Sequence, residues 1–105
     1  MQNKVIYIND LLDIYGSLLT DKQQSICNLY FKEDCSLAEI AQMESVSRTA
    51  IHDILKRSEQ LLLHYESNLN VYSSYKQRLE LYKQIQDYGN DEINLLVNKC
   101  IDTEI

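Results

Sequence analysis

Residues 36–57 read SLAEIAQMESVSRTAIHDILKR, a pattern that predicts two short helices joined by a tight turn. Ser36 and Glu39 have the S-x-x-E spacing of a capping box, in which two reciprocal hydrogen bonds start a helix. Ser47 is an N-cap candidate for the second helix. Counted from Leu37, the apolar positions that match the buried pattern of a helix-turn-helix motif are Ile40, Ala41, Val46, Ile51 and Ile54. In that motif the second helix presents its N-terminal outward side chains to a partner, which in DNA-binding proteins is the major groove.

The turn of this motif departs from the common pattern at Ser45. This position is usually Gly, because the turn residue takes a positive φ. A Ser there should cost roughly 1 kcal/mol, which a helix-turn-helix sequence tolerates.

A helix over about residues 21–32 is expected to brace the motif. Thr20 and Gln23 form a second capping box before it. Its main apolar face is expected to hold Ile26, Leu29 and Tyr30, broadened by Cys27 and Phe31.

An amphipathic helix is expected before it, from about Ile8, with Asn9 or Asp10 as start signals. Gly16 lies inside this helix, where it costs about 1 kcal/mol relative to Ala. A close helix crossing or a local kink would explain it.

The composition favours an all-α protein of one domain, or of one domain with a helical extension. The 105 residues include no Pro and only two Gly, so helix breakers are almost absent. The net charge of −6 argues against an indiscriminate nucleic-acid binder, because a strong electrostatic footprint on DNA normally needs a basic domain.

The cysteines indicate free thiols in a reducing compartment. There are three, Cys27, Cys35 and Cys100, with no C-x-x-C spacing. His52 and His64 show no metal-ligand spacing with them, so no metal and no cofactor are expected. No apolar run approaches the ~18 residues of a membrane span, and the N-terminus does not resemble a signal peptide. We therefore expect a cytoplasmic protein without a membrane partner.

The chain lacks Gly and Pro from Ser47 to Tyr88. A continuous helix there would be about 60 Å long; a break within Asn68–Ser74 would instead fold the last part back as a hairpin. The apolar spacing resembles a coiled-coil seam, so a homodimer is expected, with the domains divided as 1–60 and 61–105. The dimer-interface residues predicted from this seam are Leu62, Tyr65, Leu69, Tyr72 and Leu79.

Gly89 and Asn90 are expected to separate this region from a last helix, Asp91 to about Ile101. The apolar face of that helix comprises Ile93, Leu96, Val97 and Cys100. Residues 84–105 carry five acidic and one basic side chain, which indicates a solvated surface that could also repel nucleic acid.

The chain resembles region four of bacterial sigma factors, the helix-turn-helix that recognises the promoter −35 element. The stretches that carry this likeness are 19–23, 29–31, 36–41 and 46–48. With the tyrosine-rich continuation around 64–75, the whole chain is similar to the YlxM family of small bacterial proteins. That resemblance implies a sigma-region-four-like fold with a long C-terminal helical extension. It also implies a regulatory role linked to the signal recognition particle pathway.

The outward residues of the second helix are the candidates for contact with DNA or RNA: Arg48, Thr49, His52, Asp53, Lys56 and Arg57. An Arg can bond a guanine edge or a phosphate, and an Asp can accept from a cytosine amino group. The competing interpretation is an ordinary solvated helix face, because residues 47–60 carry only three basic against two acidic side chains. The tyrosines could stack on unpaired bases, but at helical spacing a core or dimer role is favoured.

The sequence therefore predicts a regulatory helix-turn-helix protein that binds nucleic acid. The alternative is an interaction module of the signal recognition particle, contacting its protein or its RNA, without DNA binding. No catalytic set of Ser, Cys, His and acidic residues can be assembled, and no enzyme activity is expected.

Overall fold

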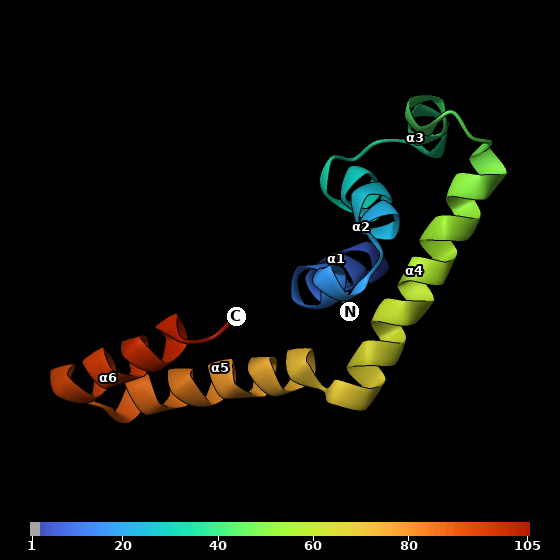
Figure 1. Cartoon of the computed structure of the whole chain (residues 1–105). Helices are drawn as coiled ribbons and strands as arrows, with labels where there is room; N and C mark the ends of the chain where they lie inside the picture. The colour runs from blue at the N-terminus through green and yellow to red at the C-terminus, as the bar shows by residue number, and fades with distance from the viewer. Residues whose placement is uncertain (1–2) are drawn as a thin grey trace. The chain divides into compact units, whose positions relative to one another are not determined.

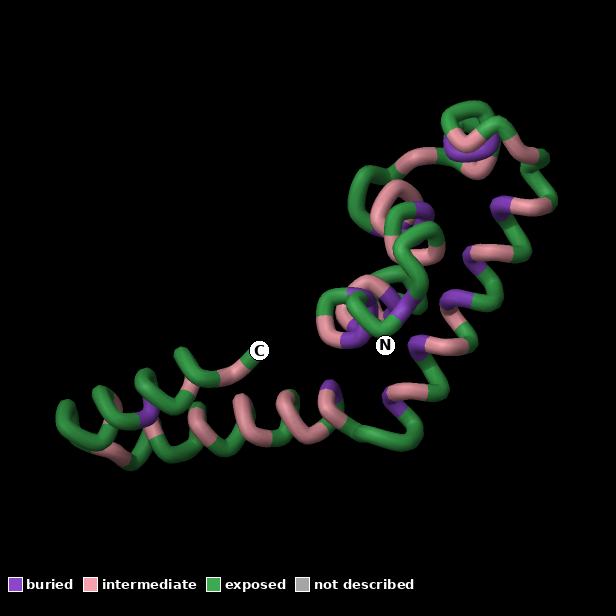
Figure 2. Tube along the Cα trace, viewed as in Figure 1, coloured by how far each residue is buried: buried purple, intermediate pink, exposed green. Residues whose placement is uncertain are grey.

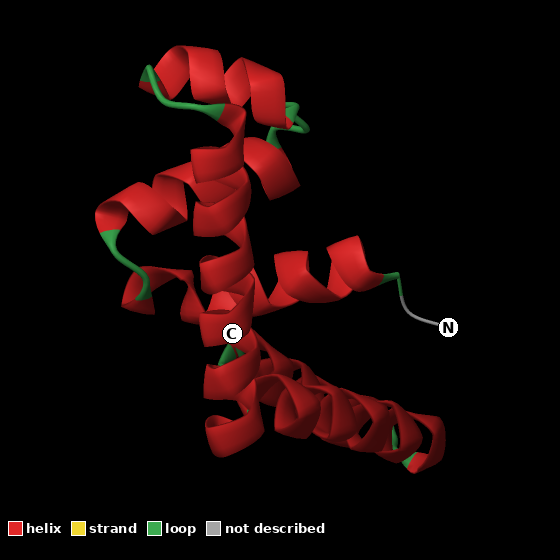
Figure 3. Ribbon diagram, turned by 90° about the vertical axis from the view of Figure 1, so that its right-hand side faces the viewer, coloured by secondary structure: helices red, strands yellow, loops and turns green. Residues whose placement is uncertain are grey.

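The computed structural model describes residues 3–105, and all regular structure within that range is helical (Figure 3). The prediction of an all-α protein is confirmed. The chain forms two compact units that divide between Leu69 and Asn70; we call residues 3–69 the first unit and residues 70–105 the second unit. None of the described helices is long and apolar enough to cross a bilayer.

The first unit is built around one long helix, α4. Its elements are α1 (Lys4–Tyr15), a 3-10 turn η1 (Gly16–Leu18), α2 (Asp21–Cys27), a π-helical turn η2 (Asn28–Lys32), α3 (Leu37–Glu44) and α4 (Arg48–Leu69). Helices α1, α2 and α3 all pack against α4 (Figure 1). The buried residues of α4 line the side that faces these helices (Figure 2), and Ile8, Leu11, Ile26, Ile40, Ile51 and Leu62 are the largest aliphatic side chains with almost no exposure.

Helix α1 begins earlier than the sequence predicts. The Asn3 side chain accepts a hydrogen bond from the Val5 N–H at 2.8 Å, which caps the helix before Lys4. The predicted start at Asn9 or Asp10 is therefore wrong. An Asn that caps a helix satisfies one of its free N–H groups, and Val5 and Ile6 then lie exposed on the first turn.

Of the two explanations that the sequence leaves open for Gly16, the structure shows a local change of helical geometry. The α-helix ends at Tyr15 and Gly16 begins the 3-10 turn. A Cβ on Gly16 would lie 3.3 Å from Leu12 Cδ1 and 3.5 Å from Gln24 Nε2. The chain therefore changes its helical geometry at Gly16, where η1 contacts α2.

The π turn changes which side chains of the bracing helix are buried. The Thr20–Gln23 capping box is present, with hydrogen bonds of 3.1 and 3.2 Å. Beyond it Ile26, Cys27 and Phe31 of the predicted face are buried, whereas Leu29 and Tyr30 are only half-buried. A π turn inserts an extra residue and rotates the following side chains about the axis, so the burial of Leu29 and Tyr30 departs from that of a regular 3.6-residue period.

The long segment from Ser47 to Tyr88 is two helices. Asn70 has φ 54° and ψ 28°, in the left-handed region, and it separates α4 from α5 (Val71–Tyr88). Asn is one of the few residues other than Gly that enters this region readily. The break falls inside the segment that the sequence marks as weak, and a single uninterrupted helix is excluded.

The second unit is a hairpin of α5 and α6 (Asp91–Asp102), which lie side by side and run in opposite directions (Figure 1). Asn90 caps α6, because its side chain accepts from the Ile93 N–H at 3.0 Å, as predicted. Gly89 has an ordinary φ of −82°. A Cβ there would lie 3.1 Å from the Ile85 carbonyl oxygen and 2.7 Å from Asn94 Oδ1, so the close approach at the hairpin turn favours glycine.

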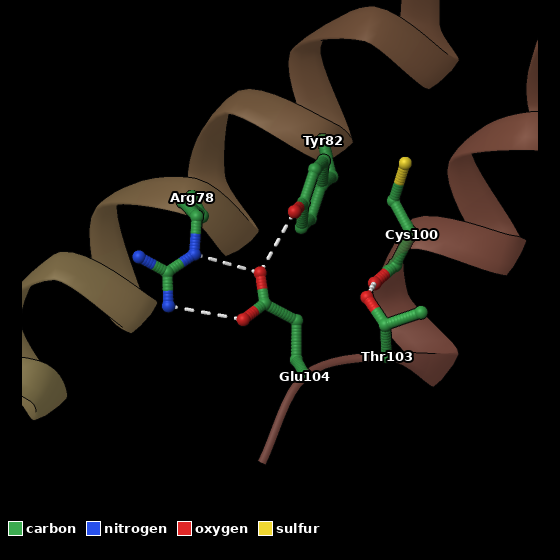
Figure 4. Close-up of polar contacts among 5 residues, drawn as sticks. All are labelled: Arg78, Tyr82, Cys100, Thr103 and Glu104. Atoms are coloured by element: carbon green, nitrogen blue, oxygen red, sulfur yellow. Dashed lines mark hydrogen bonds and ion pairs between the residues drawn. The ribbon is translucent and has the colours of Figure 1, made fainter.

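Polar contacts hold this hairpin at its open end (Figure 4). The Arg78 guanidinium donates two hydrogen bonds to the Glu104 carboxylate, at 2.7 and 3.0 Å. The Tyr82 hydroxyl donates a third, at 2.7 Å. The Arg78 hydrogen bonds, followed by that of Tyr82, lower the pKa of Glu104. The same carboxylate raises the pKa of Tyr82.

Apolar burial in the second unit is sparse. Tyr72 and Val97 are its only buried residues, while Ile93, Leu96 and Cys100 of the predicted α6 face are exposed. Within the hairpin, α6 has one neighbouring helix, α5, which covers only part of its apolar side.

Candidate nucleic-acid interface

Helix α3 and the start of α4 form the two helices expected from residues 36–57. Both bonds of the predicted capping box are made: Ser36 Oγ accepts from the Glu39 N–H at 3.1 Å, and Glu39 Oε1 accepts from the Ser36 N–H at 3.0 Å. The hydrogen bond from the backbone N–H of Ser36, followed by the Ser36 side chain, lowers the pKa of the Glu39 carboxyl. The ionised Glu39 carboxylate thus stabilises the first turn of α3.

The turn between the helices has the geometry that usually selects Gly. Ser45 has φ 57° and ψ 40°, a left-handed conformation that costs an ordinary side chain roughly 1 kcal/mol. The Val46 N–H bonds to the Ala41 carbonyl at 3.1 Å, which satisfies the end of α3. Ser47 Oγ accepts from the Ala50 N–H at 3.1 Å and starts α4. Both predicted features, the strained Ser45 and the Ser47 cap, are present.

Small and branched apolar side chains hold the two helices together. Ile40, Ala41 and Ile51 are buried, and Val46 and Ile54 are half-buried. Ala41 allows close packing, because a larger side chain at this position would push α3 away from α4. All five predicted inward positions are thus at least partly covered.

All six predicted contact residues are exposed, and they cover about half of the circumference of α4, beside the buried stripe that packs against the other helices. They occupy three consecutive turns of one rigid helix. Arg48, Thr49 and His52 also border a surface hollow whose remaining wall is Leu37 of α3. Asp53 lies beside His52, with 3.8 Å between its Oδ1 and the His52 Nδ1.

A contribution from α1 escapes sequence reasoning. Lys4 Nζ lies 3.3 Å from Glu59 Oε2, and both residues line a pocket with His52 and Lys56. Residues 47–60 contain two acidic side chains, which reduce the net positive charge of the predicted contact surface. Lys4 neutralises one of them, Glu59. No local spacing could reveal this pair, because 55 residues separate its members.

The predicted dimer residues have unequal exposure. Leu62 is fully buried in the first unit, and the Tyr65 ring packs 5.9 Å from that of Tyr15. Tyr72 is buried and Leu79 is half-buried, whereas Leu69 is exposed. A dimer contact across these five residues remains a prediction, and only Leu69 offers it a large open surface.

A short helix, a turn through a left-handed residue and a second helix with an exposed polar N-terminal half define a helix-turn-helix protein. Residues 2–99 match the family described as "Putative helix-turn-helix protein, YlxM / p13 like". The chain belongs to this family, which confirms the resemblance to the YlxM family noted from the sequence.

Similar relatives agree with this assignment. The chain is 44% identical over 82 residues to a UPF0122 protein of Clostridium acetobutylicum, covering 78% of this chain and 71% of the relative. It is 49% identical over 83 residues to one of Clostridium kluyveri, covering 79% and 75%. It is 40% identical over 97 residues to one of Streptococcus pneumoniae, covering 87% and 88%.

Proposed function

We propose that this chain is a cytoplasmic regulatory protein that binds DNA through the exposed face of α4, without enzymatic activity. The observation that supports this most strongly is the position of Arg48, Lys56 and Arg57. All three cationic side chains are exposed on a helix that packs against a buried core, with Lys56 about 80° and Arg57 about 180° around the helix axis from Arg48. Rigid placement matters because a contact residue on a firm scaffold loses little entropy when it binds.

The residues have distinct proposed roles. Arg48 and Thr49, at the first turn of α4, contact base edges or the nearest phosphates, where a recognition helix enters the groove. His52 and Asp53 lie on the next turn and can donate to, or accept from, base edges. Lys56 and Arg57 neutralise phosphates, and they supply affinity more than sequence preference.

The charge balance sets the expected strength of binding. One protomer would make about three phosphate contacts, so its affinity would fall with salt with a slope of about −3. We therefore propose a homodimer as the binding form, because two protomers double the number of contacts and can recognise two half-sites.

Binding of a labelled mixed-sequence duplex at low salt, followed by fluorescence anisotropy, tests this function. Arg48→Ala with Lys56→Ala should weaken binding and reduce the salt slope by about two per protomer. The matched control is Lys22→Ala with Lys83→Ala, which removes the same charge from exposed positions outside α4. Absence of binding at low salt, or equal losses in both double variants, would refute the proposal.

A second candidate is an interaction module of the signal recognition particle, as the family resemblance implies. The exposed apolar side chains of the second unit, among them Leu81 and Tyr88, favour a protein partner. Pull-down with the particle's protein and with its RNA, separately, distinguishes the candidates. Binding to the particle that survives Arg48→Ala with Lys56→Ala would favour the adaptor role. RNA binding that these changes abolish would indicate that the α4 face binds RNA and not DNA.

A further inference from the structure

One face of the second unit is apolar, uncharged and uncovered. Helix α5 contributes Leu81, Ile85 and Tyr88, which recur at the i, i+4, i+7 spacing of a single helical stripe. Ile93 of α6 borders the same hollow, together with Gln84 and Gly89. Leu96 and Cys100 continue the stripe of Ile93 along α6 at intervals of three and four residues. We call these six residues, Leu81, Ile85, Tyr88, Ile93, Leu96 and Cys100, the hairpin face.

The exposure of this face is large for a hairpin of this size. Tyr88 is 94% exposed, and the other four large side chains are between 42% and 60% exposed. The exposed fractions of the five side chains add up to about three fully exposed large side chains. At about 200 Å² for each, the exposed apolar area is roughly 600 Å². A standard protein–protein interface buries about 800 Å² on each partner. Five side chains thus supply most of the area that a stable contact needs.

The size of the unit indicates that something must cover this face. The second unit spans Asn70–Ile105, 36 residues, and units below about 40 residues usually need a disulfide, a metal or oligomerisation for stability. Its one cysteine, Cys100, is free. No metal-binding group of three His, Cys, Asp or Glu occurs in the described part of the chain. Oligomerisation is the remaining route.

We propose that a second copy of this chain covers the hairpin face, so that two α5–α6 hairpins form an antiparallel four-helix bundle. Two hairpins with one apolar side each are sufficient for such a bundle, and a two-fold axis requires the same patch on both copies. This inference rests on the dimer part of the proposed function and not on its nucleic-acid part.

The charges of the two helices suggest which helices meet. Helix α5 carries three basic and two acidic side chains, whereas α6 carries one basic and three acidic side chains. Placing α5 of one copy beside α6 of the other brings opposite net charges together, whereas α6 beside α6 would bring like charges together. The proposed bundle therefore pairs α5 with α6 across the interface.

The chain offers a matched pair of positions for the test. Leu95 and Leu96 are neighbours on α6 and are equally exposed, at 58% and 60%. Leu96 lies on the hairpin face, but Leu95 lies about 160° around the helix from Ile93. The same substitution at either position therefore has the same effect on composition, helix propensity and charge. The two variants differ only in the face of α6 that is changed.

Sedimentation equilibrium of the full chain without nucleic acid measures the outcome. Wild type and Leu95→Glu should have twice the protomer mass of 12.3 kDa. The matched Leu96→Glu should shift the mass toward that of the protomer, and Ile85→Glu with Leu96→Glu should have the protomer mass. Circular dichroism should show the same helical content in all four proteins.

A wild-type chain that remains monomeric at tens of micromolar would overturn the proposal. So would a dimer that persists in the Ile85→Glu, Leu96→Glu variant, or one that Leu95→Glu disrupts equally. Dissociation by Leu69→Glu with no effect of the hairpin-face variant would assign the dimer to the seam predicted from the sequence. Because no nucleic acid is present, each result is independent of whether the α4 face binds DNA.

Discussion

The two units bury their apolar side chains to very different degrees. In the first unit α4 is enclosed by α1, α2 and α3, and side chains such as Ile40, Ile51 and Leu62 have no measurable exposure. In the second unit two helices share only Tyr72 and Val97 as buried residues, and an ionic contact joins Arg78 of α5 to Glu104, just beyond α6. A core of this kind lets the first unit present α4 rigidly, whereas the second unit has apolar surface left over for a partner.

The largest expected effect is the loss of a core side chain from the first unit. Leu62→Ala should reduce the free energy of unfolding by about 2–5 kcal/mol, because Leu62 is fully buried and a cavity would remain. Leu63→Ala, at the adjacent and 41% exposed position, should stay within about 0.5 kcal/mol of wild type. Urea denaturation followed by circular dichroism measures both. A similarly small loss in the two variants would contradict the enclosed core of the first unit.

A smaller effect of opposite sign is expected at the turn of the helix-turn-helix. Ser45→Gly should stabilise the first unit by up to about 1 kcal/mol, because Gly adopts the left-handed conformation without a Cβ clash. Ser67→Gly, the same change on the right-handed backbone of α4, should instead destabilise by about 0.5–1 kcal/mol. If Ser45→Gly also destabilised the chain, Ser45 would not hold a left-handed conformation in solution.

The smallest expected effect is the pH dependence of the hairpin. Because the folded hairpin lowers the pKa of Glu104, the contribution of this carboxylate is fully present above its unfolded pKa of about 4.3. It is lost as the pH falls through the lower folded value. NMR titration of the Glu104 carboxyl should show the lowered pKa in wild type and in Lys83→Met, and a pKa closer to the ordinary value in Arg78→Met, in which only the Tyr82 hydrogen bond remains. An ordinary value in wild type would show that the clamp does not persist in solution.

Features fixed by contacts within three or four residues were predictable from the sequence. The capping boxes at Thr20 and Ser36, the caps at Ser47 and Asn90, and the left-handed turn at Ser45 depend on local hydrogen bonds and steric limits. The exposure of the six candidate contact residues follows from helical periodicity once the inner face of α4 is known.

The remaining features depend on contacts or backbone geometry that periodicity does not describe. The π turn in the second half of the bracing helix, where Leu29 and Tyr30 are only half-buried, breaks the 3.6-residue period itself. The burial of Leu62 depends on helices that lie tens of residues away in the chain, and so does the pairing of Lys4 with Glu59. The exposed stripe of α6 could not be foreseen, because a periodic apolar face does not reveal how many neighbours will cover it.

The most direct test of the proposed nucleic-acid contact is to map it on the protein. Backbone amide resonances would be followed by NMR while a short mixed-sequence DNA duplex is added at low salt. The proposal predicts the largest chemical-shift changes at Arg48, Thr49, His52, Asp53, Lys56 and Arg57, with little change on the hairpin face. Unchanged resonances in 48–57, or changes confined to Leu81, Ile85 and Leu96, would contradict recognition of nucleic acid by α4.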